Sequence, residues 1–98
     1  MKKLINVYDV HDFLIGSNNK SVLVGTNSAF DKLSKEEISC LIDKKVVLKR
    51  PGFNDVLLNV TYVDVSSSII DKKNIFILVN ENLSPSDIVD GSELYSVN

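Results

Sequence analysis

The stretch NLSPSDIVDGSELYSV, residues 82–97, decides the fold that we expect. It follows the strand-like run NIFILV, residues 74–79, and it ends in a second strand-like run, SELYSV. Between the two runs, Ser84 can cap a helical turn, and Pro85 suits the first position of that turn. Asp87 would lie in the first turn, near the positive end of the dipole. The stretch therefore predicts one helical turn between the last two strands.

Four further strand-like runs precede this stretch, each rich in Val, Ile, Leu, Phe or Tyr and bounded by turn residues. They lie at residues 4–13, 21–26, 45–50 and 55–65. We expect turns at 16–20 (GSNNK) and at 51–55 (PGFND). Pro51 and Gly52 suit the second and third positions of a type II turn, because Gly can take a positive φ.

One segment, SKEEISCLID at 34–43, has the pattern of a helix. Ser34 is followed three residues later by Glu37, which is the spacing of a capping box. Cys40 lies within this segment, and we expect it to pack as a small hydrophobic residue rather than to act as a nucleophile.

In the run DVLLNVTYVDV, one face at period two is formed by Val56, Leu58, Val60 and Tyr62. Beyond Tyr62 the apolar positions move to Val63 and Val65. This shift predicts a β-bulge, which bends a strand as a small barrel requires. The side chains expected to point into one core are Leu58, Val60, Ile77 and Leu94. Six strands at short spacing with little helix predict an all-β fold: a small, closed, six-stranded β-barrel with one or two short helical turns, in a single domain over residues 1–98.

The composition is that of a folded, water-soluble domain, with 44% hydrophobic and 24% charged residues. No apolar run reaches the roughly 18–20 residues that a membrane helix needs, and the N-terminal residues do not read as a signal peptide. Cys40 is the only cysteine, so an internal disulfide is excluded. These features predict a cytoplasmic protein without a membrane partner.

Candidates for catalysis, metal binding and cofactor binding are few. The phosphate-binding pattern GxxxxGK followed by Ser or Thr does not occur, so we expect no nucleotide and no cofactor. His11, the only histidine, shares a strand face with Asp9, which makes a weak ion site conceivable, but a polar strand position is the favoured interpretation. We therefore expect no catalytic residue and no metal site.

Two surfaces are candidates for partner binding. The basic residues Lys44, Lys45, Lys49 and Arg50 cluster around the third strand, and Lys72 and Lys73 lie in a later expected turn. Such a cluster can contact RNA or an acidic protein, although lysines also protect exposed strands from aggregation. NIFILV is apolar on both faces, so Phe76 and Leu78 on its outer face are candidates for contact with a partner protein. The formal net charge of -2 and the presence of a single arginine favour the protein.

The order of these features resembles the second domain of translational GTPases such as elongation factor Tu, a six-stranded β-barrel. The segments that carry the resemblance are VYDVH at 7–11, SVLVG at 21–25, DKKVVL at 43–48, VTYVD at 60–64, FILV at 76–79 and LSPSDIVDGSEL at 83–94. It covers residues 5–96, and the closing phrase is its most specific part. The chain departs from the family at 18–20, where the family often has GRG, and in the longer link 31–43. It also has no GTPase domain.

In that family the barrel does not catalyse a reaction but contacts the aminoacyl end of tRNA, ribosomal RNA or proteins. The resemblance therefore implies a non-catalytic, stand-alone binding module for a macromolecule, and the family's own contact residues do not transfer to this chain. Our leading interpretation is a protein-binding module, one version of which is an immunity or inhibitor protein encoded beside a toxin. The alternative is an accessory module that contacts RNA or the ribosome, and an enzyme is the least favoured interpretation.

Overall fold

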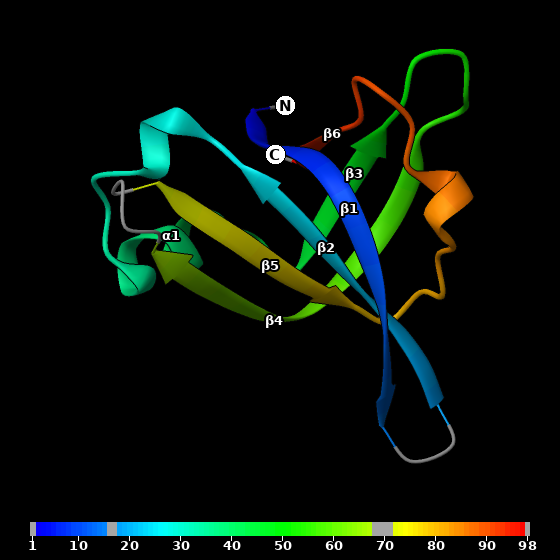
Figure 1. Cartoon of the computed structure of the whole chain (residues 1–98), viewed down its shortest axis with the longest axis horizontal. Helices are drawn as coiled ribbons and strands as arrows, with labels where there is room; N and C mark the ends of the chain where they lie inside the picture. The colour runs from blue at the N-terminus through cyan, green and yellow to red at the C-terminus, as the bar shows by residue number, and fades with distance from the viewer. Residues whose placement is uncertain (1, 16–17, 68–71, 98) are drawn as a thin grey trace.

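The computed structural model describes residues 2–15, 18–67 and 72–97. In it, antiparallel strands close into a six-stranded barrel in the order β1-β2-β5-β4-β3-β6 (Figure 1). The strands are β1 Lys3–Ile15, β2 Asn18–Thr26, β3 Lys45–Lys49, β4 Val56–Ser67, β5 Lys73–Val79 and β6 Glu93–Ser96. One helix, α1 (Lys35–Leu41), and two 3-10 turns, η1 (Ser28–Phe30) and η2 (Pro85–Asp87), complete the described elements. The predicted all-β, closed, six-stranded barrel is confirmed.

The two predicted helical segments are present because their caps form locally. At α1, the Glu37 N–H donates to Ser34 Oγ and the Ser34 N–H donates to Glu37 Oε1, both at 3.1 Å, so the capping box is complete. At η2, the Ser84 N–H donates to Asp87 Oδ2 at 2.8 Å, and Pro85 takes the first position. The helical turn predicted between the last two strands is therefore confirmed as a 3-10 turn.

One of the two turns predicted from the sequence agrees with the structure, and the other differs from it. The Phe53 N–H donates to Arg50 O at 3.2 Å and Gly52 has φ 80°, as a type II turn with Pro51 and Gly52 at its central positions requires. The turn predicted at 16–20 is wrong for Asn18–Lys20, since these residues extend β2 and pair with β1. Residues 16 and 17 lie outside the described part of the chain.

The predicted bulge in β4 is confirmed, but it lies earlier than the sequence suggested. The register with β5 shifts between Val60 and Tyr62. The bulge therefore precedes Tyr62 and reverses its orientation. Tyr62 points outward and is 55% exposed, so its predicted place on the inner face of β4 is wrong.

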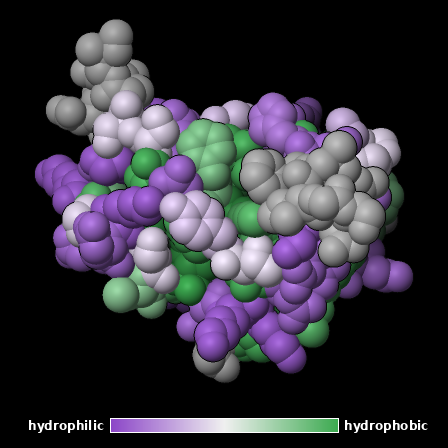
Figure 2. Space-filling model, turned by 90° about the horizontal axis from the view of Figure 1, so that it is seen from below, coloured by the Kyte–Doolittle hydropathy of each residue, from purple (hydrophilic) through white to green (hydrophobic). Residues whose placement is uncertain are grey.

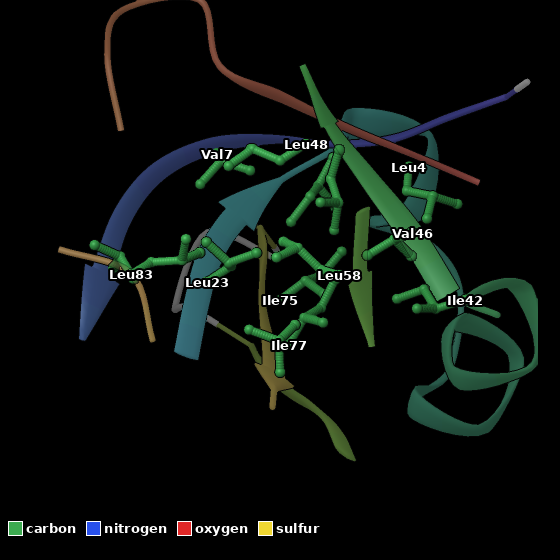
Figure 3. Close-up of a cluster of buried hydrophobic side chains, with 14 of the residues drawn as sticks. Leu4, Val7, Leu23, Ile42, Val46, Leu48, Leu58, Ile75, Ile77 and Leu83 are labelled. Atoms are coloured by element: carbon green, nitrogen blue, oxygen red, sulfur yellow. The ribbon is translucent and has the colours of Figure 1, made fainter. Parts of the chain in front are cut away.

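The inward side chains form one hydrophobic core. In Figure 3, Leu58, Ile77 and Leu23 converge from β4, β5 and β2. Leu58, Ile77 and Leu94 are fully buried, as predicted, while Val60 is half-buried and packs against the same cluster. Burial of each such side chain contributes about 1.5–3 kcal/mol.

The closing stretch is anchored to the barrel at two points. The buried Ser21 hydroxyl accepts the Leu83 N–H at 2.7 Å and donates to Leu83 O at 3.3 Å. At the other end, β6 pairs with both β1 and β3, and the Ser96 N–H donates to Lys2 O at 2.8 Å. The last strand thus completes the barrel.

Candidate functional site

The outer face of β2, β5 and β4 carries an apolar hollow. Ile75, Ile77 and Val79 of β5 point inward and are fully buried, so Phe76 and Leu78 point outward and remain half-buried. The hollow has a volume of about 330 Å³ and is named the outer groove. Its lining residues are Val22, Tyr62, Asp64, Phe76 and Leu78.

The strand register explains why these residues meet. Leu78 pairs with Val22 of β2 on one side and with Tyr62 of β4 on the other, so the three form one row across the sheet. Phe76 and Asp64 occupy the next row. Figure 2, which views the molecule from the lower side of Figure 1, shows hydrophobic surface in a hollow bordered by hydrophilic side chains. The outer groove is therefore an apolar centre with a polar border.

An ion pair and a tyrosine form the border of the outer groove on the α1 side. Lys35 Nζ lies 3.0 Å from Asp64 Oδ1, donates to Tyr62 Oη at 3.3 Å and lies 5.5 Å from the centre of the Tyr62 ring. The hydrogen bond from Lys35, and then the hydrogen bond from the Val65 N–H, lower the pKa of Asp64. The same pair raises the pKa of Lys35. These contacts hold the Tyr62 ring at the groove.

Outside the lining of the outer groove, a side chain of β1 reaches β5. The Tyr8 hydroxyl donates to Asn74 Oδ1 of β5 at 3.1 Å, and because β2 lies between β1 and β5, the Tyr8 side chain crosses the outside of β2.

His11 Nε2 lies 3.2 Å from Asp9 Oδ2, so these two residues do share a face and meet. No group of three His, Cys, Asp or Glu side chains able to hold a metal ion occurs among the described residues.

The basic residues of β3 do not form one open patch. Lys49 pairs with Asp55 at 3.0 Å. The Arg50 side chain is only 10% exposed, since it donates to Asp87 O at 3.2 Å and to Asn54 O at 3.3 Å and stacks on Phe53 at 4.8 Å. Arg50 thus holds η2 against the turn at 51–55.

The remaining lysines are separated from one another. Lys44 and Lys45 are exposed, and their side chains form no ion pair within the described residues. Lys73 begins β5 instead of lying in a turn, and its N–H donates to Asp31 Oδ1 at 3.0 Å. Because β5 pairs with β2 and β4 and not with β3, the sheet does not bring Lys73 beside the basic residues of β3.

Cys40 is exposed, so the prediction that it packs as a small hydrophobic residue is wrong. Ile38 is the fully buried residue of α1, and a residue two positions further lies on the opposite side of a helix with 3.6 residues per turn. Helical periodicity therefore predicts that Cys40 is exposed when Ile38 is buried.

Of the outer groove, the sequence identified Phe76 and Leu78 but missed Val22, Tyr62 and Asp64. The run SVLVG is apolar at successive positions, which was a usable signal that Val22 lies on an apolar outer face. Tyr62 was missed because the bulge precedes it and turns its side chain to the outer face.

Comparisons of the chain with protein families, with curated proteins and with solved structures gave no match. Within the described residues, none of the helices has the length and apolar character needed to cross a membrane.

Proposed function

We propose that the chain is a non-catalytic protein-binding module that docks its partner through the outer groove. The observation that carries the proposal is the pair Phe76 and Leu78, half-buried on the outside of a sheet whose inner face already forms the core. Burial of apolar surface favours association by about 25 cal/mol per Å². An exposed apolar area bordered by polar residues is typical of an interaction surface.

The border suggests the chemistry of the partner. Tyr62, held by Lys35, offers an aromatic ring beside the aliphatic floor of Val22 and Leu78. Such a hollow accommodates an aliphatic or aromatic side chain of a partner protein, in the way that interface anchors fill pockets. A small barrel that blocks another protein through such an anchor is consistent with the immunity or inhibitor role.

The resemblance to the second domain of translational GTPases supports a binding role without catalysis. Its closing phrase corresponds to η2 and β6, which complete the barrel around the core.

The RNA alternative has less support. Of the four basic residues around β3, Lys49 and Arg50 already pair with carboxylates of the chain, and only Lys44 and Lys45 remain. Two phosphate contacts on single-stranded RNA would give a slope of log affinity against log salt of about -1.4.

The test is affinity capture with cross-linking and mass spectrometry, using the wild-type chain, Phe76→Ser and Leu78→Ser. Leu57→Ser is the control, because Leu57 is a leucine that is 52% exposed and lies outside the outer groove. We expect cross-links from the outer groove to one protein, with the affinity of the purified partner lowered by Phe76→Ser and Leu78→Ser and kept by Leu57→Ser.

Two outcomes would contradict the proposal. One is a partner that binds Phe76→Ser and Leu78→Ser as tightly as the wild type. The other is tight binding of generic RNA that weakens with salt and disappears on changing Lys44 and Lys45 to Glu, which would establish the RNA alternative.

A further inference from the structure

The second half of β4 has an unpaired edge. Residues 56–59 pair with β3, and the Val60 N–H donates to Lys44 O at 2.7 Å. From Tyr62 onward β4 pairs with β5 alone, and no described strand lies on its other side (Figure 1). An unpaired edge presents N–H and C=O groups that can bind a further strand.

The orientation of this edge follows from a contact of Val65. Its N–H donates to Asp64 Oδ1 at 2.9 Å. Residues of an antiparallel strand alternate between hydrogen-bonded and non-hydrogen-bonded pairs. We infer that Val65 is in a non-hydrogen-bonded pair with Ile75, and that Val63, two residues earlier, also directs its N–H and C=O away from β5. Val63 and Val65 therefore offer backbone hydrogen bonds to an added strand.

A second hollow lies between α1 and the start of this edge. It has a volume of about 420 Å³ and is named the edge groove. Its lining residues are Lys35, Ser39, Ile42, Asp43, Lys44, Val60, Thr61, Tyr62 and Val63. A strand that continues the line of β3 along β4 would run through the edge groove.

The charges around the edge groove favour an acidic occupant. Lys35 is already paired with Asp64. Lys44 lines the groove and Lys45 follows it, and both are exposed without an ion pair within the described residues, whereas Asp43 is the one further carboxylate in the lining. The charge left to be matched is therefore positive, which attracts a carboxylate on the incoming strand.

We propose that a protein partner adds an extended segment to β4 as an extra strand through the edge groove. The segment pairs its backbone with Val63 and Val65 and places an acidic side chain at Lys44 and Lys45. This inference rests on the proposed protein-binding function and adds the conformation and charge of the segment that binds. Tyr62 lines both grooves, so one partner can occupy the outer groove and the edge at the same time.

Before a strand is added, the Asp64 side chain occupies the hydrogen-bonding position of the Val65 N–H on this edge. Its carboxylate accepts the Val65 N–H and also pairs with Lys35. When the strand is added, one of its carbonyl groups accepts the Val65 N–H in place of the Asp64 carboxylate. Asp64 remains paired with Lys35. The Val65 N–H therefore has an acceptor both before and after the exchange, which keeps the cost of binding at this residue low.

The test uses a displayed library of random peptides of about ten residues, long enough to follow the edge at ~3.3 Å per residue. Peptides enriched on the wild-type chain are synthesised and titrated into wild type, Val63→Pro and Val63→Ala. Proline removes the N–H that the added strand needs, and it is tolerated where that N–H faces solvent. Alanine keeps the N–H and is the matched control. Val65→Pro is the second variant, in case Val63→Pro does not fold.

We expect peptides with Asp or Glu and alternating apolar residues, which bind Val63→Ala nearly as tightly as the wild type. Val63→Pro should weaken them by roughly fivefold to tenfold, because it removes one neutral hydrogen bond and leaves a carbonyl group of the added strand without its donor. In the wild type, the changes in amide chemical shift on peptide binding, measured by NMR, should be largest at Val63 and Val65. Changing Lys44 and Lys45 to Glu should also weaken binding.

Equal binding to Val63→Pro and Val63→Ala, or the absence of any enriched peptide, would overturn the inference. Phe76→Ser separates the two proposals. If that variant loses peptides that Val63→Pro retains, docking in the outer groove stands and strand addition fails. If Val63→Pro loses peptides that Phe76→Ser retains, strand addition stands and docking in the outer groove fails.

Discussion

Gly25 is the position where the smallest side chain should cost the most. It pairs with Val7 of β1 and with Ile75 of β5 in the wall of the barrel. A Cβ atom at Gly25 would lie 2.2 Å from Asn6 O and 2.8 Å from Ile5 Cδ1. Asn6 O belongs to the backbone, so it cannot move away without a shift of β1, and the Ile5 side chain is fully buried in the core.

We therefore expect Gly25→Ala to reach or exceed the upper end of the usual cost of overpacking, about 3 kcal/mol. The free energy of unfolding of a domain of this size is about 5–15 kcal/mol, so this change is a large fraction of the total. Urea unfolding followed by circular dichroism measures it. With a slope of about 1–3 kcal/mol per M, the midpoint should fall by roughly 1–3 M.

Gly52→Ala is the matched control. Gly52 has φ +80° and nothing within 4 Å of an added Cβ, so alanine there meets only the cost of a left-handed backbone, about 1–2 kcal/mol. If Gly25→Ala destabilises the protein no more than Gly52→Ala, the close approach of β1 and β2 at Gly25 is not as described, and the reasoning fails.

Two further predictions concern the core and the border of the outer groove. Leu58→Ala and Ile77→Ala should each lower the free energy of unfolding by about 2–5 kcal/mol, because both side chains are fully buried, and a change below about 0.5 kcal/mol in urea unfolding would contradict this. Lys35→Met should raise the pKa of the Asp64 carboxyl in a carbon-13 NMR titration, since Lys35 is the main cause that lowers it. The folded-state pKa of Asp64 lies below the unfolded value, so its stabilising contribution is present above the unfolded pKa and is lost as the pH falls through the folded pKa. An unchanged Asp64 titration in Lys35→Met would rule out the ion pair.

The fold was predictable where the deciding interactions are local. Ser34 and Glu37 cap α1 from three residues apart, and Ser84 and Asp87 do the same at η2. Period-two patterning placed Leu58 on the inner face correctly. The same pattern failed at Tyr62, because a bulge shifts the alternation by one residue and its position depends on how β4 pairs with β5.

The candidate site was predictable only in part, because its polar contacts join distant parts of the chain. Phe76 and Leu78 follow from a strand that is apolar on both faces. Arg50 looked like a free cation, but its partner Asp87 is 37 residues away and is brought to it by barrel closure. The pairing of Lys35 with Asp64 has the same origin, since the helix and the strand meet only in the folded barrel.

The place of β6 between β1 and β3 also sets an order of assembly. The pairs β1–β2, β3–β4 and β4–β5 join neighbours along the chain and can form as the ribosome delivers them. Lys3 of β1 finds Tyr95 of β6 only after the intervening residues have been synthesised, and such long-range pairing is slow. Until Glu93–Ser96 emerges, β1 and β3 each keep one edge unpaired, and open edges on a nascent chain can pair with other chains. Chains interrupted before Glu93 should therefore be prone to aggregation, and rapid delivery of these four residues should protect the newly made protein.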